Sequence, residues 1–330
     1  MKKIAAAGII ILLLITAVYA FAASYGSTES VIICSSMEEF RGNALQEQLN
    51  EKFPDKNIIV TYMPTGKAAS KVFAEGSDTE IDMLVGLGTG YLSKIEDSLA
   101  DVSELSTIPY LDEFTTEKNN NLWVTWEKFA GAIIVNTEIL DKYGLKAPKD
   151  YDDLLKPEYK GLVAMPDPKS SGTGYFFYKS WVNSMGEEAA LDYIDKLYVN
   201  VKAFTESGSG PIKMLKQGEI AVGLGMTFQA VTEINNGQPF EIIFPQTGSP
   251  YSLTGTAMLK GRETNPEIIE IFKFIINDFI VYDKENYSPD TIYENQINKI
   301  PNYPQNVTYA DMTGIQDSAE RERLLSLWKY

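Results

Sequence analysis

The chain has 330 residues, of which 44% are hydrophobic and 22% charged, a balance typical of globular proteins rather than of disordered, collagen-like or coiled-coil chains. Its formal net charge of −16 argues against tracking the phosphate backbone of nucleic acids, which needs a basic surface. The sequence has no histidine, which excludes Ser-His-Asp and Cys-His catalysis and histidine-ligated metal sites, and its one cysteine excludes an internal disulfide.

The first residues have the layout of a secretory signal peptide. Two lysines precede an apolar stretch over residues 4–18, and Ala20 and Ala22 then supply small residues at the −3 and −1 positions of a cleavage site. We expect residues 1–22 to be removed on export, which would place the protein in the periplasm or at the outer face of the cytoplasmic membrane. The alternative is an uncleaved anchor, since the apolar stretch approaches the length that spans a bilayer.

The first half of the remaining chain alternates between apolar runs and amphipathic segments. The predicted strands cover residues 30–34, 57–62 and 81–85. The predicted helices cover residues 37–52 and 67–75, with a third beginning near Tyr91. Strands that alternate with helices in this way indicate an α/β fold with a mainly parallel sheet.

A second α/β series follows. Its predicted strands cover residues 132–136, 161–165, 219–224, 241–244 and 256–259, and its predicted helices cover residues 175–185, 187–197, 229–236 and 266–279. Beyond residue 280 the chain is polar and rich in Tyr, Asn and Pro. We expect this tail to wrap a surface and to end in a short helix near residues 320–328.

Small polar residues follow nearly every predicted strand, and another group precedes a helix that we expect to begin at Pro211. Those after strands are, in chain order, Ser35 and Ser36, then Thr65, then Thr89, then Ser171, Gly172 and Thr173, and finally Thr227 with Phe228 and Gln229. Those before the Pro211 helix are Ser207, Gly208 and Ser209. Hydroxyl groups and glycine amides at helix N-termini form anion-binding cups, although any single Ser or Thr there can instead be a helix cap. Because the carboxyl ends of parallel strands meet at one edge of a sheet, we expect these loops to converge.

The patterns give little support to an enzyme. The glycines of residues 86–90 lack the Gly-Lys-Ser/Thr ending of a phosphate-binding P-loop, and the Ser170-Ser171-Gly172 sequence is not a nucleophile elbow. Neighbouring acids such as Glu38 and Glu39 point in different directions on a helix. Trp126 and Phe228 lie where we expect a cleft wall, with burial in the core as the alternative.

Residues 147–175, APKDYDDLLKPEYKGLVAMPDPKSSGTGY, resemble a segment of the bacterial extracellular solute-binding proteins (family 1, type 2 periplasmic binding proteins). Neighbouring pieces that match the same pattern are residues 30–36, 81–92, 99–102, 131–137, 207–211 and 218–225. The resemblance covers nearly all of the chain beyond the leader. It is to the group of ABC importers that binds ferric iron, thiamine, 2-aminoethylphosphonate and hexose phosphates.

This resemblance implies a type II fold with two lobes, each a mainly parallel sheet flanked by helices, joined by two crossovers around a central cleft. The first lobe would comprise residues 29–128 and 256–330, and the second lobe residues 129–255. The resemblance also implies a monomer that is not an enzyme, holds no cofactor or resident metal, and closes on a small solute by hinge rotation. Its partners would be the permease and ATPase subunits of an ABC importer.

The resemblance leaves the solute open. Ferric binders of this group use two adjacent tyrosines after the strand equivalent to residues 219–224, whereas residues 225–229 read GMTFQ here. The hydroxyls and glycine amides favour a phosphate, phosphonate or sugar phosphate, whose remaining part would meet Gln229, Trp126, Phe228 or an acid such as Glu38. The alternatives are ferric iron with or without a bound anion, a cation such as thiamine or a polyamine, an exported hydrolase, and a sensor subunit with the same fold.

Overall fold

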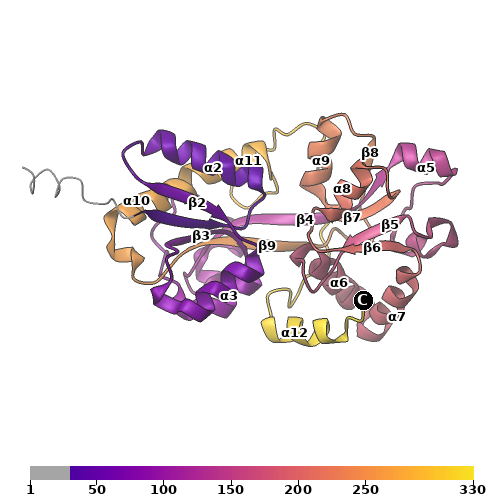
Figure 1. The fold of residues 1–330 in the computed structure, drawn as a ribbon, viewed down its shortest axis with the longest axis horizontal. Coiled ribbons are helices and arrows are strands. Elements are labelled where there is room, and N and C mark those ends of the chain that lie inside the picture. Colours follow the sequence, from indigo (N-terminus) through magenta and orange to yellow (C-terminus); the bar gives the residue numbers. More distant parts are fainter. Residues whose placement is uncertain (1–29) are drawn as a thin grey trace, which may run out of the picture.

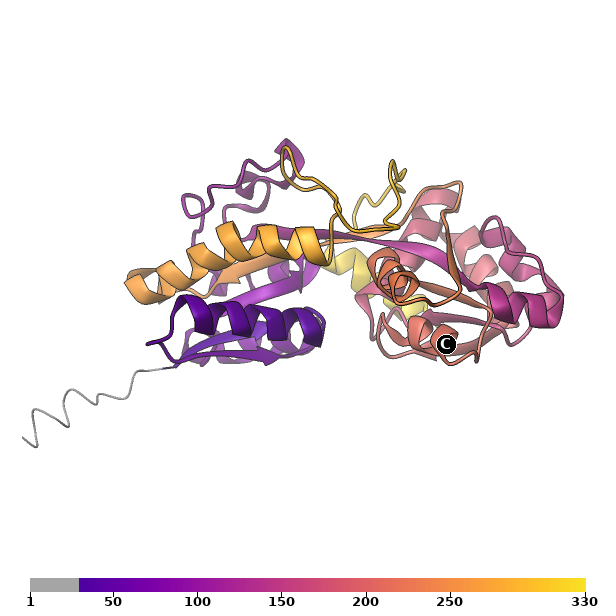
Figure 2. The same ribbon diagram turned by 90° about the horizontal axis from the view of Figure 1, so that it is seen from above.

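The computed structural model describes residues 30–330, so the expected signal peptide lies outside the described residues. Two lobes lie end to end and are joined by two long strands, β4 (Val124–Asn136) and β9 (Tyr251–Met258) (Figures 1 and 2). Within residues 30–330, no helix combines the length and the apolar composition that crossing a membrane requires. The two-lobe α/β architecture expected from the sequence is confirmed.

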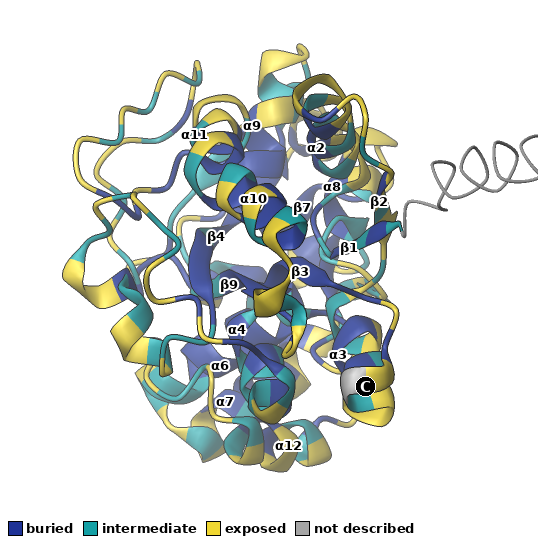
Figure 3. Ribbon diagram, turned by 90° about the vertical axis from the view of Figure 1, so that its left-hand side faces the viewer, coloured by how far each residue is buried: buried dark blue, intermediate teal, exposed yellow. Residues whose placement is uncertain are grey.

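The first lobe is built on three parallel strands, β1 (Val31–Ser35), β2 (Ile58–Tyr62) and β3 (Met83–Gly88), in the order β2-β1-β3-β9. Its helices are α2 (Glu39–Lys52), α3 (Thr65–Glu75), α4 (Thr89–Leu92), α10 (Pro266–Phe274), a π-helical turn (Ile275–Phe279) and α11 (Ile280–Asn286). Viewed from the first-lobe end, the strands are buried between helices whose outward sides are exposed (Figure 3). β1 is mostly apolar and buried because it is central, whereas β2 lies at the edge of the sheet and buries only its first residue, Ile58.

The second lobe contains β5 (Val163–Pro166), β6 (Val201–Thr205), β7 (Val222–Met226) and β8 (Phe240–Ile243). Its helices are α5 (Thr137–Tyr143), α6 (Gly172–Met185), α7 (Glu187–Tyr198), α8 (Gly210–Lys216) and α9 (Thr227–Asn235). An aromatic cluster fills its core, with the ring of Trp181 centred 5.4 Å from Tyr151 and 5.0 Å from Tyr193. Short 3-10 helices in the two lobes cover Gly76–Asp78, Ser93–Ser98, Asp112–Phe114, Thr116–Asn119, Tyr151–Leu155, Pro157–Tyr159 and Arg262–Thr264.

Strand β4 belongs to both lobes and makes each sheet mixed. Its first half pairs antiparallel with β9, and its second half pairs antiparallel with β7 and β8. The expected parallel arrangement therefore holds for β2-β1-β3 and for β6-β5-β7, and the strands that cross between the lobes run the other way. Gly131 lies where β4 changes partners, and a Cβ atom there would come within 2.5 Å of the Phe176 ring. The crossover thus requires glycine at this position.

The end of the chain packs on the second lobe. Residues 256–280 return to the first lobe, where Met258 and Phe272 join its core. The last residues instead enter the second-lobe core, to which they contribute Tyr303, Ala310, Met312, Leu324 and Trp328. Trp328, just beyond helix α12 (Ser318–Leu327), packs its ring 5.5 Å from that of Tyr178. This packing differs from the sequence expectation, which put all of residues 256–330 in the first lobe, and it follows from the aromatic surface that the second lobe offers.

The expected elements differ from the observed ones mainly at their ends. Strand β6 was not predicted, because its sequence VKAFT is short and follows the α7 helix after only two residues. Strand β4 extends well before the expected residues 132–136, and α6 begins at Gly172 rather than at residue 175. The α10 helix continues through the π-helical turn into α11, so the long amphipathic helix expected over residues 266–279 is present in interrupted form.

Candidate functional site

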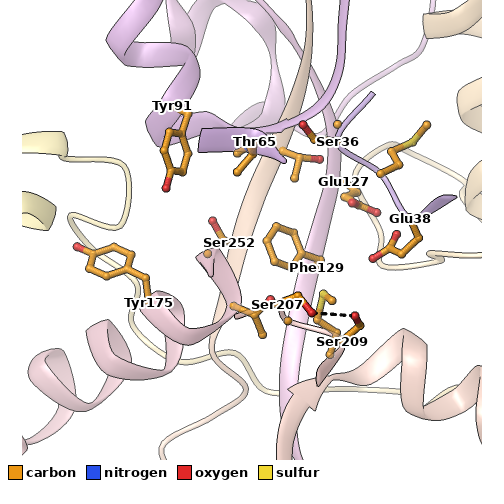
Figure 4. Close-up of a pocket in the computed structure, with 18 of the residues that line it drawn as sticks. Ser36, Glu38, Thr65, Tyr91, Glu127, Phe129, Tyr175, Ser207, Ser209 and Ser252 are labelled. Carbon is orange, nitrogen blue, oxygen red and sulfur yellow. Dashed lines mark hydrogen bonds between the residues drawn. The ribbon is translucent and has the colours of Figure 1, made fainter. Parts of the chain in front are cut away.

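A pocket of about 210 Å³ lies between the lobes and is open to solvent (Figure 4). The first lobe lines it with loops that follow β1, β2 and β3, and the second lobe with α6 and with the loops after β6 and β7. Phe129 of β4 and Ser252 of β9 form its floor between the lobes. The pocket therefore sits at the carboxyl ends of the parallel strands of both sheets, where ligands bind in open α/β folds.

Hydroxyl groups on the first-lobe wall are held in place by backbone contacts. Ser36 donates a hydrogen bond to the Met63 carbonyl at 2.7 Å, which ties the β1 loop to the β2 loop. The Thr65 hydroxyl accepts from the Gly88 amide at 3.0 Å and so links the β2 and β3 loops. These bonds fix the three loops relative to one another, and each hydroxyl oxygen keeps capacity for a further bond.

The second-lobe wall is formed by Thr173 and by the Ser207-Gly208-Ser209 loop. The Ser207 and Ser209 hydroxyls lie 3.2 Å apart (Figure 4). A Cβ atom on Gly208 would fall 2.3 Å from the Thr173 Oγ1 atom, so the loop reaches this close to α6 only because residue 208 is glycine. Ser171 caps α6 by accepting from the Gly174 amide at 3.5 Å.

Four helices of nine or more residues begin at the pocket: α2, α3, α6 and α9. Among the described residues, no side chain caps the first turn of α2, α3 or α9, so their first amides keep free donors. Helix N-termini carry partial positive charge and favour anions, with each contact worth about 0.3–1 kcal/mol. Helices from both lobes therefore present donors to the same space.

One end of the pocket is acidic and belongs to a buried charge network. Glu38 and Glu127 line it, and both are bonded to the Arg41 guanidinium, Glu38 at 3.1 Å and Glu127 at 2.7 Å. Arg41 also donates two bonds of 2.8 and 2.7 Å to Asp283, which is fully buried. Lys284 adds a second cation 2.9 Å from Asp283. Three carboxylates thus share two cations.

The acids of this network ionise differently. Burial raises the pKa of Glu38 even though Arg41 opposes it, so this carboxyl, which faces the pocket, is the easier to protonate. Burial acts in the same direction on Glu127 and Asp283, but Arg41 and Lys284 outweigh it and hold the pKa of each below its usual value. Glu38 also accepts a bond of 3.3 Å from the Gln229 amide, which crosses from the second lobe.

The other end of the pocket is aromatic and basic. Arg321 of α12 lies between Tyr91 of the first lobe and Tyr175 of the second, with its guanidinium 4.5 and 4.6 Å from the two ring centres. It donates to the Tyr91 hydroxyl at 2.8 Å. Its neighbour in the pocket wall is Ile315 from the same C-terminal segment.

Most residues predicted from the strand-end loops line this pocket. They are Ser36, Thr65, Gly172, Thr173, Ser207, Gly208, Ser209, Phe228 and Gln229. The loops of both lobes therefore converge as the sequence analysis expected. Whether these residues contact a solute remains a prediction.

The other predicted residues do not line the pocket. Ser35 accepts from the Met37 amide, Thr89 donates to the Leu253 carbonyl, and Ser171 is used as a helix cap. Thr227 is buried at the start of α9. Trp126 is fully buried and stacks on Phe279 in the first-lobe core, because strand alternation turns Glu127 rather than Trp126 toward the pocket.

Several lining residues were not among the predicted site residues. They are Met37, Tyr62, Gly86, Gly88, Gly90, Tyr91, Glu127, Phe129, Tyr175, Met226, Ser252, Thr254, Ile315 and Arg321. Tyr62 is the last residue of β2, and Tyr91 comes soon after β3, so the strand-end rule could have found both. Arg321 comes from the far end of the chain, and the one signal available was the scarcity of arginine, which occurs at only four positions.

The lining offers little to a metal ion. Among residues 30–330 no group of three or more His, Cys, Asp or Glu side chains could hold one. Tyr62, Tyr91 and Tyr175 line the pocket, but burial raises the pKa of Tyr62 and of Tyr175, which opposes the phenolate form that ferric iron prefers.

Comparisons with known proteins agree with this architecture. The bacterial extracellular solute-binding protein family matches residues 87–285. An uncharacterized protein of Haemophilus influenzae is 33% identical over 247 residues, which cover 70% of this chain and 68% of that protein. The spermidine/putrescine-binding periplasmic protein of Escherichia coli is 23% identical over 269 residues, covering 77% of this chain and 75% of that protein.

Solved structures show the same fold. The periplasmic binding protein AfuA from Actinobacillus pleuropneumoniae, solved with fructose-6-phosphate, has a TM-score of 0.79 at 24% identity over 91% of this chain and 97% of its own. The periplasmic binding protein P5PA has a TM-score of 0.77 at 23% identity, over 91% of this chain and 98% of its own. The chain therefore belongs to the bacterial extracellular solute-binding proteins, the family that supplies the substrate-binding components of ABC importers.

Proposed function

We propose that the protein captures a small solute carrying a phosphate or phosphonate group and delivers it to an ABC permease. The observation that carries this proposal is the convergence of hydroxyls and free helix amides from both lobes on one pocket. A solute can drive closure of the lobes only if it contacts both of them at once. An anionic group between α3 and α6 would do so, because each helix presents its N-terminus from a different lobe.

The hydrogen-bond donors of the pocket can replace the water that an anion loses on binding, which supports an anionic solute. A phosphate dianion loses its hydration shell on entering the pocket and needs several donors in return. Thr65, Ser207 and Ser209 supply hydroxyls, and Gly172 and Thr173 supply amides in the first turn of α6. We assign the remaining, uncharged or ammonium-bearing part of the solute to the acidic end at Glu38 and Glu127, where hydroxyl or ammonium donors would find acceptors.

A cationic solute is the second candidate, and the acidic end of the pocket is the observation that favours it. Glu38 and Glu127 stand beside the aromatic rings of Tyr62 and Phe129, a combination that also suits a polyamine. The similarity to the spermidine/putrescine-binding protein points the same way. Against it, Arg41 already neutralises Glu127, and burial raises the pKa of Glu38.

The structural relatives support the anion. The AfuA structure contains fructose-6-phosphate, and the resemblance to it spans both lobes. We further propose that the chain is exported after loss of residues 1–22, acts as a monomer and is not an enzyme. We place residues 29–128 and the return from residue 256 in the first lobe, residues 129–255 in the second, and the last residues, from about 303, with the second lobe on account of their packing.

A thermal-shift screen with matched pairs of compounds tests this proposal. The pairs are fructose 6-phosphate with fructose and 2-aminoethylphosphonate with ethanolamine; inorganic phosphate, ferric citrate, thiamine and spermidine complete the panel. A ligand at about a thousand times its dissociation constant stabilises the folded state by roughly 4 kcal/mol. We expect a raised melting temperature with the phosphorus-bearing member of a pair and none with its partner. A shift with spermidine or thiamine alone would contradict the anion assignment.

A further inference from the structure

We propose that Arg321, on the C-terminal helix α12, is the positive charge that binds the anionic group of the solute. This inference rests on the proposed function, because it names the side chain that the phosphate or phosphonate would meet. It assigns a binding role to a segment that lies outside the two sheets and that the strand-end loops do not include.

First, Arg321 is buried without an ion-pair partner. The residue is only 8% exposed and lines the pocket, and within residues 30–330 no carboxylate oxygen lies within 4 Å of its guanidinium nitrogens. Its hydrogen bond to the Tyr91 hydroxyl leaves further N–H donors of the guanidinium for a ligand. Burying a charge without a partner is costly, which is why such a charge at a pocket wall points to an anionic ligand.

Second, the acids beside Arg321 pair with other residues. Glu320 pairs with Lys179 of the second lobe at 2.8 Å, and Glu322 pairs with Lys94 of the first lobe at 2.7 Å. These two bonds tie α12 to both lobes, and they leave the residue between them turned toward the pocket. Asp317 is used as the helix cap.

Third, the guanidinium is restrained in its orientation. It lies 4.5 and 4.6 Å from the ring centres of Tyr91 and Tyr175, which come from opposite lobes, and one Nη donates to the Tyr91 hydroxyl. Its remaining N–H groups can be donated to the oxygens of a phosphate. Tyr91 and Tyr175 are thus positioning residues for Arg321.

The arrangement also connects binding to lobe closure. The segment before α12 touches the first lobe, where a Cβ atom on Gly90 would lie 3.5 Å from the Gln316 carbonyl, while Leu324 and Trp328 are packed in the second-lobe core. An anion bound by Arg321 would therefore be held by a helix that is attached to both lobes. Such a contact favours the state in which Tyr91 and Tyr175 face each other.

Calorimetric titration with fructose 6-phosphate and with inorganic phosphate tests the proposal. The wild type is compared with Arg321→Gln and with the matched control Arg323→Gln. Arg323 lies two residues after Arg321 and forms an exposed ion pair with Glu187, so the control removes the same charge outside the pocket. We expect Arg321→Gln to raise the dissociation constant by about thirtyfold or more and Arg323→Gln to leave it unchanged. An unchanged constant in Arg321→Gln would overturn the proposal and leave the proposed function standing.

Two further outcomes are decisive. If the wild type binds spermidine and neither phosphate probe, the proposed function fails, and this inference fails with it. If Arg321→Gln does not fold, Arg321→Lys replaces it, because lysine keeps the charge and loses the planar fork. Arg321→Lys should raise the dissociation constant by about three- to tenfold. A lower melting temperature with an unchanged dissociation constant would mean that Arg321 acts only in packing.

Discussion

Replacement of Arg41 by methionine tests the buried charge network under the acidic end of the pocket. Arg41 is 1% exposed and makes contacts of 2.7 to 3.3 Å with Glu38, Glu127 and Asp283. Without it three carboxylates share Lys284 alone, and Asp283 has no access to water. Breaking a buried pair on one side costs about 3–5 kcal/mol, because the remaining charge stays desolvated.

Urea unfolding measures this cost. We expect Arg41→Met to lower the free energy of unfolding by about 4 kcal/mol at pH 7, with the slope against urea unchanged. For a lobe-sized unit this corresponds to a fall in melting temperature of roughly 8–16 °C. The control is Lys196→Met, which removes an exposed pair with Asp192 and should leave stability unaltered. A loss below about 1 kcal/mol would refute the reasoning.

The same variant has a defined pH dependence. In the folded wild type the pKa values of Asp283 and Glu127 are lowered. The stability that these carboxylates contribute is therefore present above their pKa in the unfolded chain, near 4, and is lost as the pH falls through their pKa in the folded protein. Without Arg41 only Lys284 opposes burial, so these pKa values rise, and protonation relieves the repulsion between the carboxylates. The stability difference between wild type and Arg41→Met should therefore shrink from pH 7 to pH 4.5, and growth on acidification would be inconsistent with the network.

Two predictions concern Gly131 in the crossover strand β4 and Asp290 in the segment after α11. Gly131→Ala should lower the free energy of unfolding by about 1–3 kcal/mol in urea melts, because the new methyl group would meet the Phe176 ring at 2.5 Å; a neutral effect would mean that β4 shifts freely. Asp290 accepts hydrogen bonds from the hydroxyls of Tyr303 and Tyr309, and burial raises its pKa. Its contribution to the free energy of unfolding is therefore complete below the pKa of the unfolded chain and is lost as the pH rises through the pKa of the folded protein. Between pH 4 and pH 7, wild-type stability should fall relative to that of Asp290→Asn, and parallel pH profiles would show that this carboxyl is not the cause.

The part of the pocket that is formed by loops at strand ends could be predicted from the sequence. Alternating strands and helices place the residues after β1, β2 and β7 at one edge, so Ser36, Thr65 and Gln229 were found without a structure. Ser207 was found because it precedes a predicted helix, although strand β6 before it was not predicted. The rule could not separate Ser36 from Ser35, because which of two adjacent residues faces the pocket depends on where the strand ends. The same one-residue ambiguity selected Trp126 in place of Glu127.

The basic end of the pocket could not be predicted from local sequence patterns. Arg321 reaches the site because α12 docks on the second lobe through Leu324 and Trp328, a contact between segments about 150 residues apart that no periodicity reveals. The buried network at Arg41 depends in the same way on Asp283, which lies far along the chain. Tertiary packing, not strand-end geometry, sets both charged ends of the pocket.

The most direct test of the account compares Gly172→Glu with Gly172→Gln. Gly172 opens helix α6 at the pocket wall, and apart from its chain neighbours and the backbone of its own helix, no atom of residues 30–330 would lie within 4 Å of a Cβ atom there. A glutamate at a helix N-terminus is compatible with folding, but it would occupy the place that we assign to the anion. Calorimetric titration with fructose 6-phosphate should show a dissociation constant at least about tenfold higher for Gly172→Glu than for Gly172→Gln. Equal affinities of the two variants for fructose 6-phosphate would contradict an anion site between the lobes.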